Sequence, residues 1–344
     1  PLNLGFDVNI AGHAAGAPKS YLGTENFGNT EEFKDSPWPV PGLEQYHGQD
    51  IFLTEALTRE ALQVLDTCVR KEQPFFLYMA HYAVHTPIMA DERYFQSYLG
   101  QGLDSIEARY ASLVEGMDKS LGDLMSFLDE RGIADQTIIL FMSDNGGLSA
   151  HARGGIPHTH NKPLSSGKGS IHEGGIREPM LVKWPGVTPP NTVNDNYLII
   201  EDFYPSILEM AGIEDYEPVQ RVDGLSFVPM LEDYAPVPQD RSLYWHYPNE
   251  WGPEGPGIGA FSAVRRGDWK LIYYHDDESF ELFNLTKDIG ETENLAATET
   301  DMLKELAADL SAYLKSVDAQ LPAHKGSGEQ VRWPEAAVAE PLLE

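Results

Sequence analysis

Cysteine is almost absent from this sequence, with one in 344 residues. A lone cysteine excludes a disulfide framework and any zinc site built from cysteines. Long apolar runs are missing too: the longest, Pro74–Ala80 and Thr137–Met142, fall far short of the about 20 residues that span a bilayer. No charged and apolar leader follows Pro1, so we expect any signal peptide to be removed or to lie upstream. The composition predicts an ordinary globular protein.

Positive charge is also scarce, since 24 Lys and Arg stand against 54 Asp and Glu, a net charge of −30. A field of that sign repels nucleic acid and anionic membrane surfaces, and it excludes both as expected partners. One stretch differs: His151–Gly186 holds five basic residues against two acidic ones, together with four of the 11 histidines. This basic island predicts a pocket for a small anion; the alternative is a surface patch balanced by neighbouring acids.

Apolar spacing predicts the elements of the first two thirds of the chain. Helical periodicity covers Thr54–Lys71 and Asp104–Arg131. Continuous apolar runs at Pro74–His81, Thr137–Met142 and Met180–Trp184 are typical of buried parallel strands. Strands alternating with long helices favour a wound α/β sheet. Residues 1–50 have little periodicity and are predicted to form long ordered loops.

After Leu231 the pattern changes to short aromatic and β-branched runs separated by turns. These runs predict a small antiparallel sheet covered by one helix. The strands are expected at Ser242–Tyr247, Ala260–Arg265, Trp269–His275 and Glu281–Asn284, and the helix at Asp301–Val317. We therefore expect a catalytic domain over residues 1–235, a small C-terminal subdomain over 236–318, and a tail or an arm on a neighbouring surface over 319–344.

Two predicted strands run into polar clusters, His81–Pro87 and Ser143–Gly147. Ligands of open α/β sheets bind at the carboxyl ends of strands, so we expect both clusters to face one crevice. Asp144 and Asn145 supply adjacent oxygen ligands of the kind that hard cations prefer, although a plain turn is the alternative. Lys168, between two glycines, can extend its ammonium group into a cleft; the alternative is a flexible surface loop.

Taken in order, these motifs resemble the sulfatase family of the alkaline-phosphatase superfamily. The resemblance implies an alkaline-phosphatase-like sandwich around a mostly parallel sheet, one Ca²⁺ held in part by Asp144 and Asn145, and contacts of His85 and Lys168 with the sulfate ester. A cation, an ammonium group and an imidazole suit the negative charge that sulfuryl transfer concentrates. The matching stretches are Pro74–Tyr78 with His85–Pro87, Ser143–Gly146, Gly167–Gly169 with Glu173–Arg177 and Trp184–Gly186, Asp223–Ser226, and Arg266–Ile272.

One departure from the family is large. Sulfatases convert a Cys or Ser in a Cys/Ser-x-Pro/Ala-x-Arg motif to formylglycine, and that motif is absent from these residues. Cys68 lies on the apolar side of a predicted helix and is interpreted as a core residue. The family's paired aspartates and its Gly-Lys-Trp-His segment are also absent; in the family they precede the Gly-Phe-Asp stretch, here Gly5–Asp7. The resemblance therefore predicts a chain that starts after its nucleophile region, able to associate with that segment or to form a homo-oligomer.

The expected substrate is a sulfated sugar of a glycosaminoglycan, mucin or algal glycan, because the pocket is rich in loops. The family resemblance implies a periplasmic or secreted location. The candidate sugar contacts, each of which has an ordinary loop residue as its alternative, are His158, His160, Asn161, His13 and His246.

Two rival functions stay open at this point. A phosphodiesterase or phosphonate hydrolase of the same superfamily holds two transition metals and tends to show Asp-His-Gly where this chain has Asp144-Asn145-Gly146. An Asn amide suits calcium better than zinc, which favours the sulfatase. The second rival is a non-catalytic carbohydrate-binding relic that keeps the pocket without a nucleophile.

Overall fold

The computed structural model describes residues 1–148, 161–213, 215–232, 236, 238, 241–249 and 254–339. The chain divides into two compact units, Pro1–Thr137 and Ile138–Glu344. Within the described ranges, none of the helices combines the length and the apolar character needed to cross a lipid bilayer.

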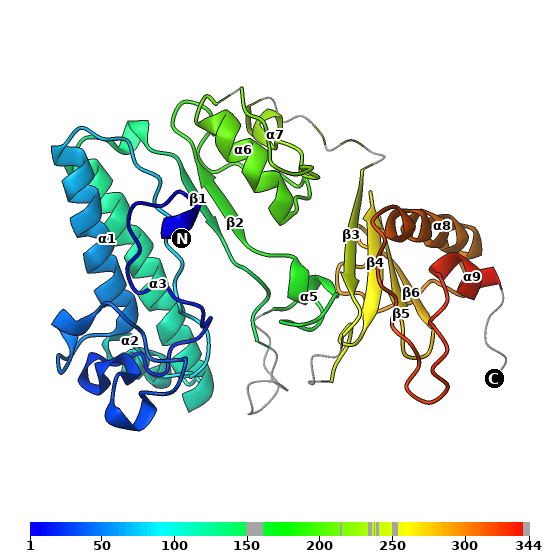
Figure 1. The fold of residues 1–344 in the computed structure, drawn as a ribbon, viewed down its shortest axis with the longest axis horizontal. Helices are drawn as coiled ribbons and strands as arrows, with labels where there is room; N and C mark the ends of the chain where they lie inside the picture. Colours follow the sequence, from blue (N-terminus) through cyan, green and yellow to red (C-terminus); the bar gives the residue numbers. More distant parts are fainter. Residues whose placement is uncertain are drawn as a thin grey trace. The chain divides into compact units, whose positions relative to one another are not determined.

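The first unit is built on three helices: α1 (Leu53–Arg70), α2 (Glu92–Gly100) and α3 (Ser105–Glu130) (Figure 1). Both helices predicted from periodicity, α1 and α3, are confirmed to within one residue at each end. The carboxylate of Asp104 caps α3 by accepting hydrogen bonds from the backbone of Ile106 and Glu107. Helix α2 was not predicted; it begins after Asp91, whose side chain caps it.

The first 50 residues are ordered loops with short 3₁₀ turns, as predicted. Tyr21, Phe27 and Leu43 are fully buried there and pack with Leu53 and Leu113 of the helices. The loops therefore share the core of this unit, which holds their backbone in place without regular structure. The 3₁₀ turns of the unit are Leu2–Leu4, Gly23–Gly28, Glu31–Phe33, Glu44–Tyr46 and Ala134–Gln136.

The strand predicted at Pro74–His81 is wrong for the structure described. Residues 73–82 form no strand, and Phe76 and Tyr78 are 63% and 72% exposed. A buried strand needs neighbours that pair its backbone N–H and C=O groups, and no described strand pairs with this run. An apolar run indicates that its side chains tend to be buried, but it does not provide a neighbouring strand for its backbone to pair with.

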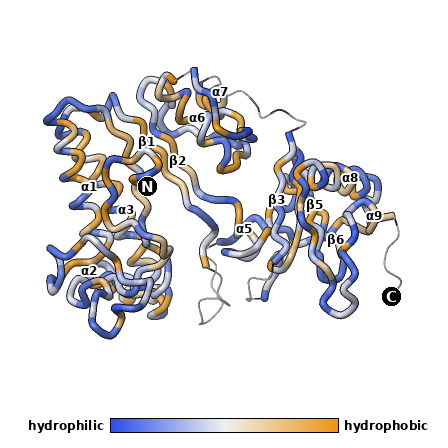
Figure 2. The backbone as a smooth tube through the Cα atoms, viewed as in Figure 1, coloured by the Kyte–Doolittle hydropathy of each residue, from blue (hydrophilic) through white to orange (hydrophobic). Residues whose placement is uncertain are grey.

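The second unit begins with a two-stranded antiparallel sheet, β1 (Ile139–Met142) and β2 (Met180–Lys183). Both strands were predicted, but their pairing is antiparallel, so the parallel arrangement expected between these runs is not found. Figure 2 shows both strands as largely hydrophobic. Other elements of this part are α5 (Glu173–Ile176), a 3₁₀ turn at Ile200–Asp202, α6 (Phe203–Met210) and α7 (Val228–Glu232).

The rest of this unit is an antiparallel meander in the order β3-β4-β5-β6, as predicted (Figure 1). Helix α8 (Thr300–Ser316) covers one face, where Leu306, Leu310 and Leu314 pack on Leu271 and Leu282. The α/β class with a C-terminal antiparallel sheet is thus confirmed. The strands are β3 (Ser242–Tyr247), β4 (Phe261–Arg266), β5 (Trp269–Tyr274) and β6 (Phe280–Asn284).

The segment predicted as a tail or an arm packs on this sheet. Val331 and Ala337 are buried in the same apolar cluster, and α9 (Pro334–Ala339) lies against α8. The Tyr273 hydroxyl donates to the Arg332 carbonyl oxygen at 2.9 Å. Domain boundaries near residues 235 and 318 stay a prediction.

Candidate active site

The turn after β1 carries the two candidate cation ligands, Asp144 and Asn145. The Ser143 hydroxyl donates to the Asn145 carbonyl oxygen at 2.9 Å, and the Gly146 N–H donates to the Gly175 carbonyl oxygen at 3.1 Å. A Cβ atom on Gly146 would lie 1.8 Å from the Gly174 carbonyl oxygen, so only glycine fits there. The backbone of this turn therefore packs directly against the segment that contains α5.

The Lys168 turn is joined to the same place through its backbone. Lys168 N–H donates to the Gly147 carbonyl oxygen at 3.1 Å. The Asn161 side-chain nitrogen lies 2.8 Å from that oxygen and 3.0 Å from the Ser166 carbonyl oxygen. The structure thus brings together the Asp144 and Lys168 turns. The Asn161 amide nitrogen holds the two turns, and a contact of this residue with substrate stays a prediction.

Lys168 is half-buried, and its Nζ has no hydrogen bond or ion pair among the described residues. An ammonium group held in this way can take an external anion. His158 and His160, in the stretch between the two turns, are candidate contacts that lie outside the described residues.

The groups around Asp144 fit a cation in part. The β1–β2 register ends with Met142 facing Met180; continued by two residues, after Met142 and before Met180, it brings Asp144 and Glu178 to facing positions. Glu178 Oε1 is buried without a hydrogen-bond partner, and burial together with the charge of Asp144 raises the pKa of Glu178 to about 7. Facing carboxylates repel one another, and a bound cation would relieve that repulsion.

The set is nevertheless incomplete, because the described residues contain no group of three or more His, Cys, Asp or Glu arranged to hold a metal ion. Sequence reasoning missed Glu178, since only the antiparallel register reveals its place opposite Asp144. The Asn145 side chain donates to the Gly146 carbonyl oxygen at 3.1 Å, and this bond leaves the amide oxygen available as a ligand.

Helix α5 is anchored to the C-terminal sheet by buried ions. Lys270 Nζ lies 3.0 Å from Glu173 Oε1 and 2.8 Å from Glu291 Oε1, and all three side chains are buried. Arg177 Nε reaches the other oxygen of Glu173 at 2.6 Å. Buried charges persist only when they are paired, so this cluster fixes the segment after Lys168 firmly.

The first unit presents His85 in a loop held by tyrosines. The Tyr21 hydroxyl lies 2.6 Å from the Tyr82 carbonyl oxygen and 2.9 Å from the His85 carbonyl oxygen. His85 Nδ1 lies 3.1 Å from the Thr86 carbonyl oxygen and 3.2 Å from the Thr86 hydroxyl; in the tautomer that carries a proton on Nδ1, it donates to the carbonyl. His85 Nε2 has no hydrogen bond among the described residues. His85 also lines a pocket of about 490 Å³ together with Trp38, which the sequence analysis missed.

The other two histidines predicted to touch sugar use both ring nitrogens inside the protein. His13 contacts the Tyr82 hydroxyl at 2.8 Å and the Pro37 carbonyl oxygen at 3.0 Å. His246 on β3 contacts the Ser262 hydroxyl at 2.8 Å and the Gln320 carbonyl oxygen at 3.1 Å. His13 lies beside the His85 loop, whereas His246 belongs to the C-terminal sheet. The meeting of His85 with Asp144 and Lys168 in one site stays a prediction, because the two units are described separately.

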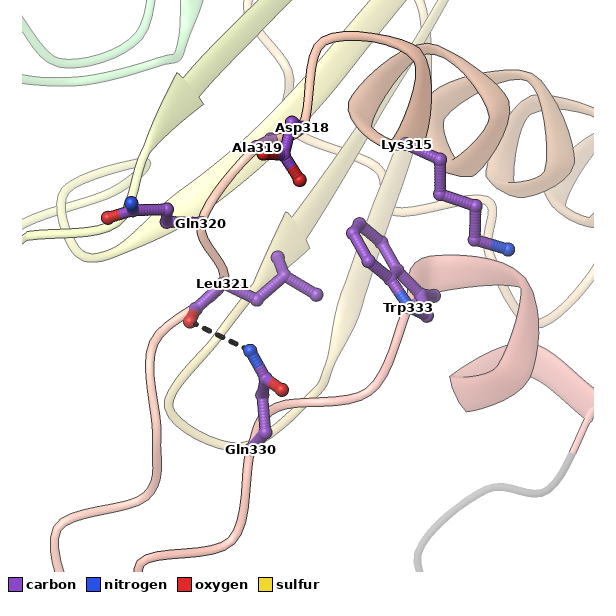
Figure 3. Close-up of a pocket in the computed structure, with 7 residues that line it drawn as sticks. All are labelled: Lys315, Asp318, Ala319, Gln320, Leu321, Gln330 and Trp333. Atoms are coloured by element: carbon purple, nitrogen blue, oxygen red, sulfur yellow. Dashed lines mark hydrogen bonds between the residues drawn. The ribbon is translucent and has the colours of Figure 1, made fainter.

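A larger pocket, of about 630 Å³, lies in the C-terminal part of the chain and holds none of the predicted site residues. Figure 3 shows it between the end of α8 and the loop before α9, where the Gln330 side-chain amide donates a hydrogen bond to the Leu321 carbonyl oxygen. Volume alone does not locate chemistry, and His85 and Lys168 remain the better guides to the active site. Its lining is Lys315, Asp318, Ala319, Gln320, Leu321, Gln330 and Trp333.

The chain is similar to sulfatases over most of its length. A family model described as Sulfatase matches residues 5–213, and one described as N-sulphoglucosamine sulphohydrolase, C-terminal, matches residues 167–320. A sulfatase of Formosa agariphila is 33% identical over 279 residues, which cover 76% of this chain and 48% of that protein. The N-acetylgalactosamine-6-sulfatase of Mus musculus is 32% identical over 257 residues, covering 74% and 44%. The chain thus spans about half the length of these curated relatives.

A solved structure shows the same fold. The crystal structure of Ps i-CgsB in complex with k-i-k-neocarrahexaose has a TM-score of 0.71 and 26% identity, covering 94% of this chain and 69% of that chain. This similarity confirms the predicted alkaline-phosphatase-like α/β fold.

Proposed function

Because the chain belongs to the sulfatase family, we propose that its protein hydrolyses sulfate esters of sulfated sugars. The observation that carries the proposal is the joining of two turns, in which Lys168 N–H bonds the Gly147 carbonyl oxygen and Asn161 clamps both. This joining brings Lys168, whose ammonium group has no partner among the described residues, to the turn of Asp144 and Asn145. A sulfate ester is an anion that needs both kinds of group around it.

Sulfatases generally use a divalent metal, and we propose Ca²⁺ held in part by Asp144 and Asn145. When bound, the cation would supply positive charge beside the sulfate oxygens. Lys168 would bind the sulfate and the departing oxygen through its ammonium group. His85, in the tautomer whose Nδ1–H donates to the Thr86 carbonyl oxygen, would present Nε2 to the leaving group and deliver a proton there once the imidazole is protonated. The formylglycine motif is absent from these residues, so no step is assigned to the nucleophile.

The proposed substrates are sulfated sugars of glycosaminoglycan, mucin or algal type. Relatives support this class by name, an N-acetylgalactosamine-6-sulfatase among them, and one structural relative is complexed with a neocarrahexaose. A periplasmic or secreted location is proposed on the family resemblance.

The test uses the protein expressed from its complete gene. Sulfate release from sulfated monosaccharides and oligosaccharides is measured for the wild type, His85→Ala and Lys168→Ala. Each variant should lose roughly 10²–10³ in turnover, because each removes one donor to charge developing in the transition state. Unchanged turnover in either variant would contradict the site, and wild-type protein with no sulfate release from any sugar would contradict the function.

Metal content provides a second measurement on the same protein. If Asp144→Ala loses both its calcium content and its turnover, the assignment of Asp144 as a ligand is supported. Two zinc ions per chain would instead favour the phosphodiesterase hypothesis.

A further inference from the structure

Trp38 is one of the partly exposed aromatic residues of the first unit. It is 44% exposed and belongs to none of the apolar clusters of the described residues, whereas Tyr21 and Phe27 are fully buried and Phe76 and Tyr78 are more exposed still. A single exposed apolar side chain needs no explanation by itself. Trp38 differs from an ordinary exposed residue in two further respects: its backbone is restrained by hydrogen bonds, and its side chain lines a pocket.

The backbone that carries Trp38 is held at several points. The Trp38 carbonyl oxygen accepts a hydrogen bond from Lys19 N–H at 2.8 Å, and the Pro37 carbonyl oxygen contacts His13 Nε2 at 3.0 Å. Val40, fully buried, donates its N–H to the Phe27 carbonyl oxygen at 3.2 Å. Prolines on both sides of Trp38 restrict φ further. The indole is therefore presented on a stiff support, and binding against it would order little additional chain.

The indole lines the same pocket as the imidazole of His85. This pocket, of about 490 Å³, lies within the roughly 300–1,000 Å³ usual for small-molecule sites. Its other lining residues are small or apolar apart from Thr86, whose hydroxyl already contacts His85 Nδ1 at 3.2 Å. His85 Nε2, which has no hydrogen bond among the described residues, is thus the polar side-chain group of the wall, and the indole is its broad flat surface.

His13 ties these two walls together. Its Nε2 contacts the carbonyl oxygen of Pro37, next to Trp38, and its Nδ1 contacts the hydroxyl of Tyr82, in the His85 loop. The segments that carry the indole and the imidazole are therefore linked within the first unit. A ligand that touches both must have an apolar face and a polar edge.

We propose that Trp38 is the residue on which the sugar ring of the substrate stacks while its sulfate ester meets His85. The proposal rests on the proposed function and names the residue that favours saccharides within it. A pyranose packs its C–H face on an aromatic ring while its hydroxyl groups remain solvated. A rigid, half-exposed indole suits such a ligand. Hot spots of recognition commonly consist of such a Trp in a pocket with little to reorganise.

The test measures binding, which does not require catalysis. The dissociation constants of a panel of sulfated monosaccharides and carrageenan oligosaccharides, and of inorganic sulfate, are measured by calorimetry for wild type, Trp38→Ala and Trp38→Phe. The matched control is Tyr204→Ala, which removes an aromatic side chain of similar exposure, 50%, from the other unit. Trp38 is outside every core cluster, so Trp38→Ala should fold, and circular dichroism checks this.

We expect Trp38→Ala to raise the dissociation constant of the tightest-binding sulfated saccharide by about tenfold or more, while that of inorganic sulfate stays unchanged. Trp38→Phe should keep most of the affinity, and Tyr204→Ala all of it. Wild-type saccharide affinity in Trp38→Ala would overturn the proposal, as would a wild type that binds no saccharide more tightly than sulfate. Failure of the proposed function is seen separately, as absence of sulfate release by the wild-type protein from its complete gene.

Discussion

The two units anchor their site loops by different means. In the second unit, the segment after Lys168 is fixed by buried ions, with Lys270 between Glu173 and Glu291. In the first unit, neutral hydrogen bonds from Tyr21 hold the loop of His85. An ion cluster in a low-dielectric interior fails as a whole when one partner is removed, whereas a neutral hydrogen bond can be lost singly at modest cost. The segment after Lys168 should therefore be more rigid and less tolerant of mutation than the loop of His85.

The largest expected effect is that of Lys270→Met, because it leaves Glu173 and Glu291 buried with one cation fewer. The free energy of unfolding should fall by about 3–5 kcal/mol, measured by urea denaturation. The control is Lys315→Met, which removes an ion pair with Glu335 in which both side chains are over 40% exposed; it should change stability by at most about 1 kcal/mol. Equal losses in the two variants would refute the contrast between buried and exposed anchoring.

Acid pH gives the next largest effect, through His275, which lies fully buried after β5. Burial, with the neighbouring His246 adding to it, lowers the pKa of His275 to about 4. The unfolded chain binds this proton near pH 6.5, so stability is fully present above that value and is lost as pH falls toward 4. At pH 4.5 the loss should be about 2–3 kcal/mol.

Urea denaturation at pH 7.0, 5.5 and 4.5 checks this prediction against His275→Gln, which should flatten the curve. Burial also lowers the pKa of His81 in the first unit to about 4, and its Nδ1 is buried without a partner. His81→Gln should flatten the curve by a similar amount, because the pKa of His81 is lowered to the same value. An unchanged curve in either variant would contradict the assignment of that histidine.

The smallest effect is expected for Tyr21→Phe, which removes a hydroxyl from the Tyr82 and His85 carbonyl oxygens. The ring still fills its place against Phe52, so the loss should be about 1–2 kcal/mol in urea denaturation. The control Tyr78→Phe alters an exposed hydroxyl and should leave stability unchanged. A loss for Tyr21→Phe as large as that for Lys270→Met would mean that the two anchors are equivalent.

Elements made from contacts near in sequence could be predicted well. Strands β3–β6 each pair with the next strand along the chain, and short turns join β4 to β5 and β5 to β6. Alternation of side chains is therefore enough to place them. Helix α3 could likewise be predicted, because Asp104 caps its start and the apolar residues that follow keep helical spacing. The run Phe75–Ala80 has equally apolar residues but no such neighbour, and its prediction as a buried strand is wrong.

The candidate site was predicted in part for the same reason. Asp144, Asn145 and Lys168 stand in recognisable motifs, and the structure joins their turns through Gly147 and Asn161. Glu178 and Trp38 carried no signal of their own. The first depends on the antiparallel register of β1 and β2, and the second on the folding of loops that lack periodicity.

The sequence by itself determined the family, the acidic charge, the main helices and the C-terminal meander, because short-range periodicity and motif order suffice for these. Only the tertiary structure decided that Gly146 must lie against Gly174, that Lys270 is buried between two glutamates, and that Trp38 shares a pocket with His85. Each of these depends on residues distant in sequence meeting at close range. Such meetings follow from packing and from the pairing of buried polar groups, which no local pattern encodes.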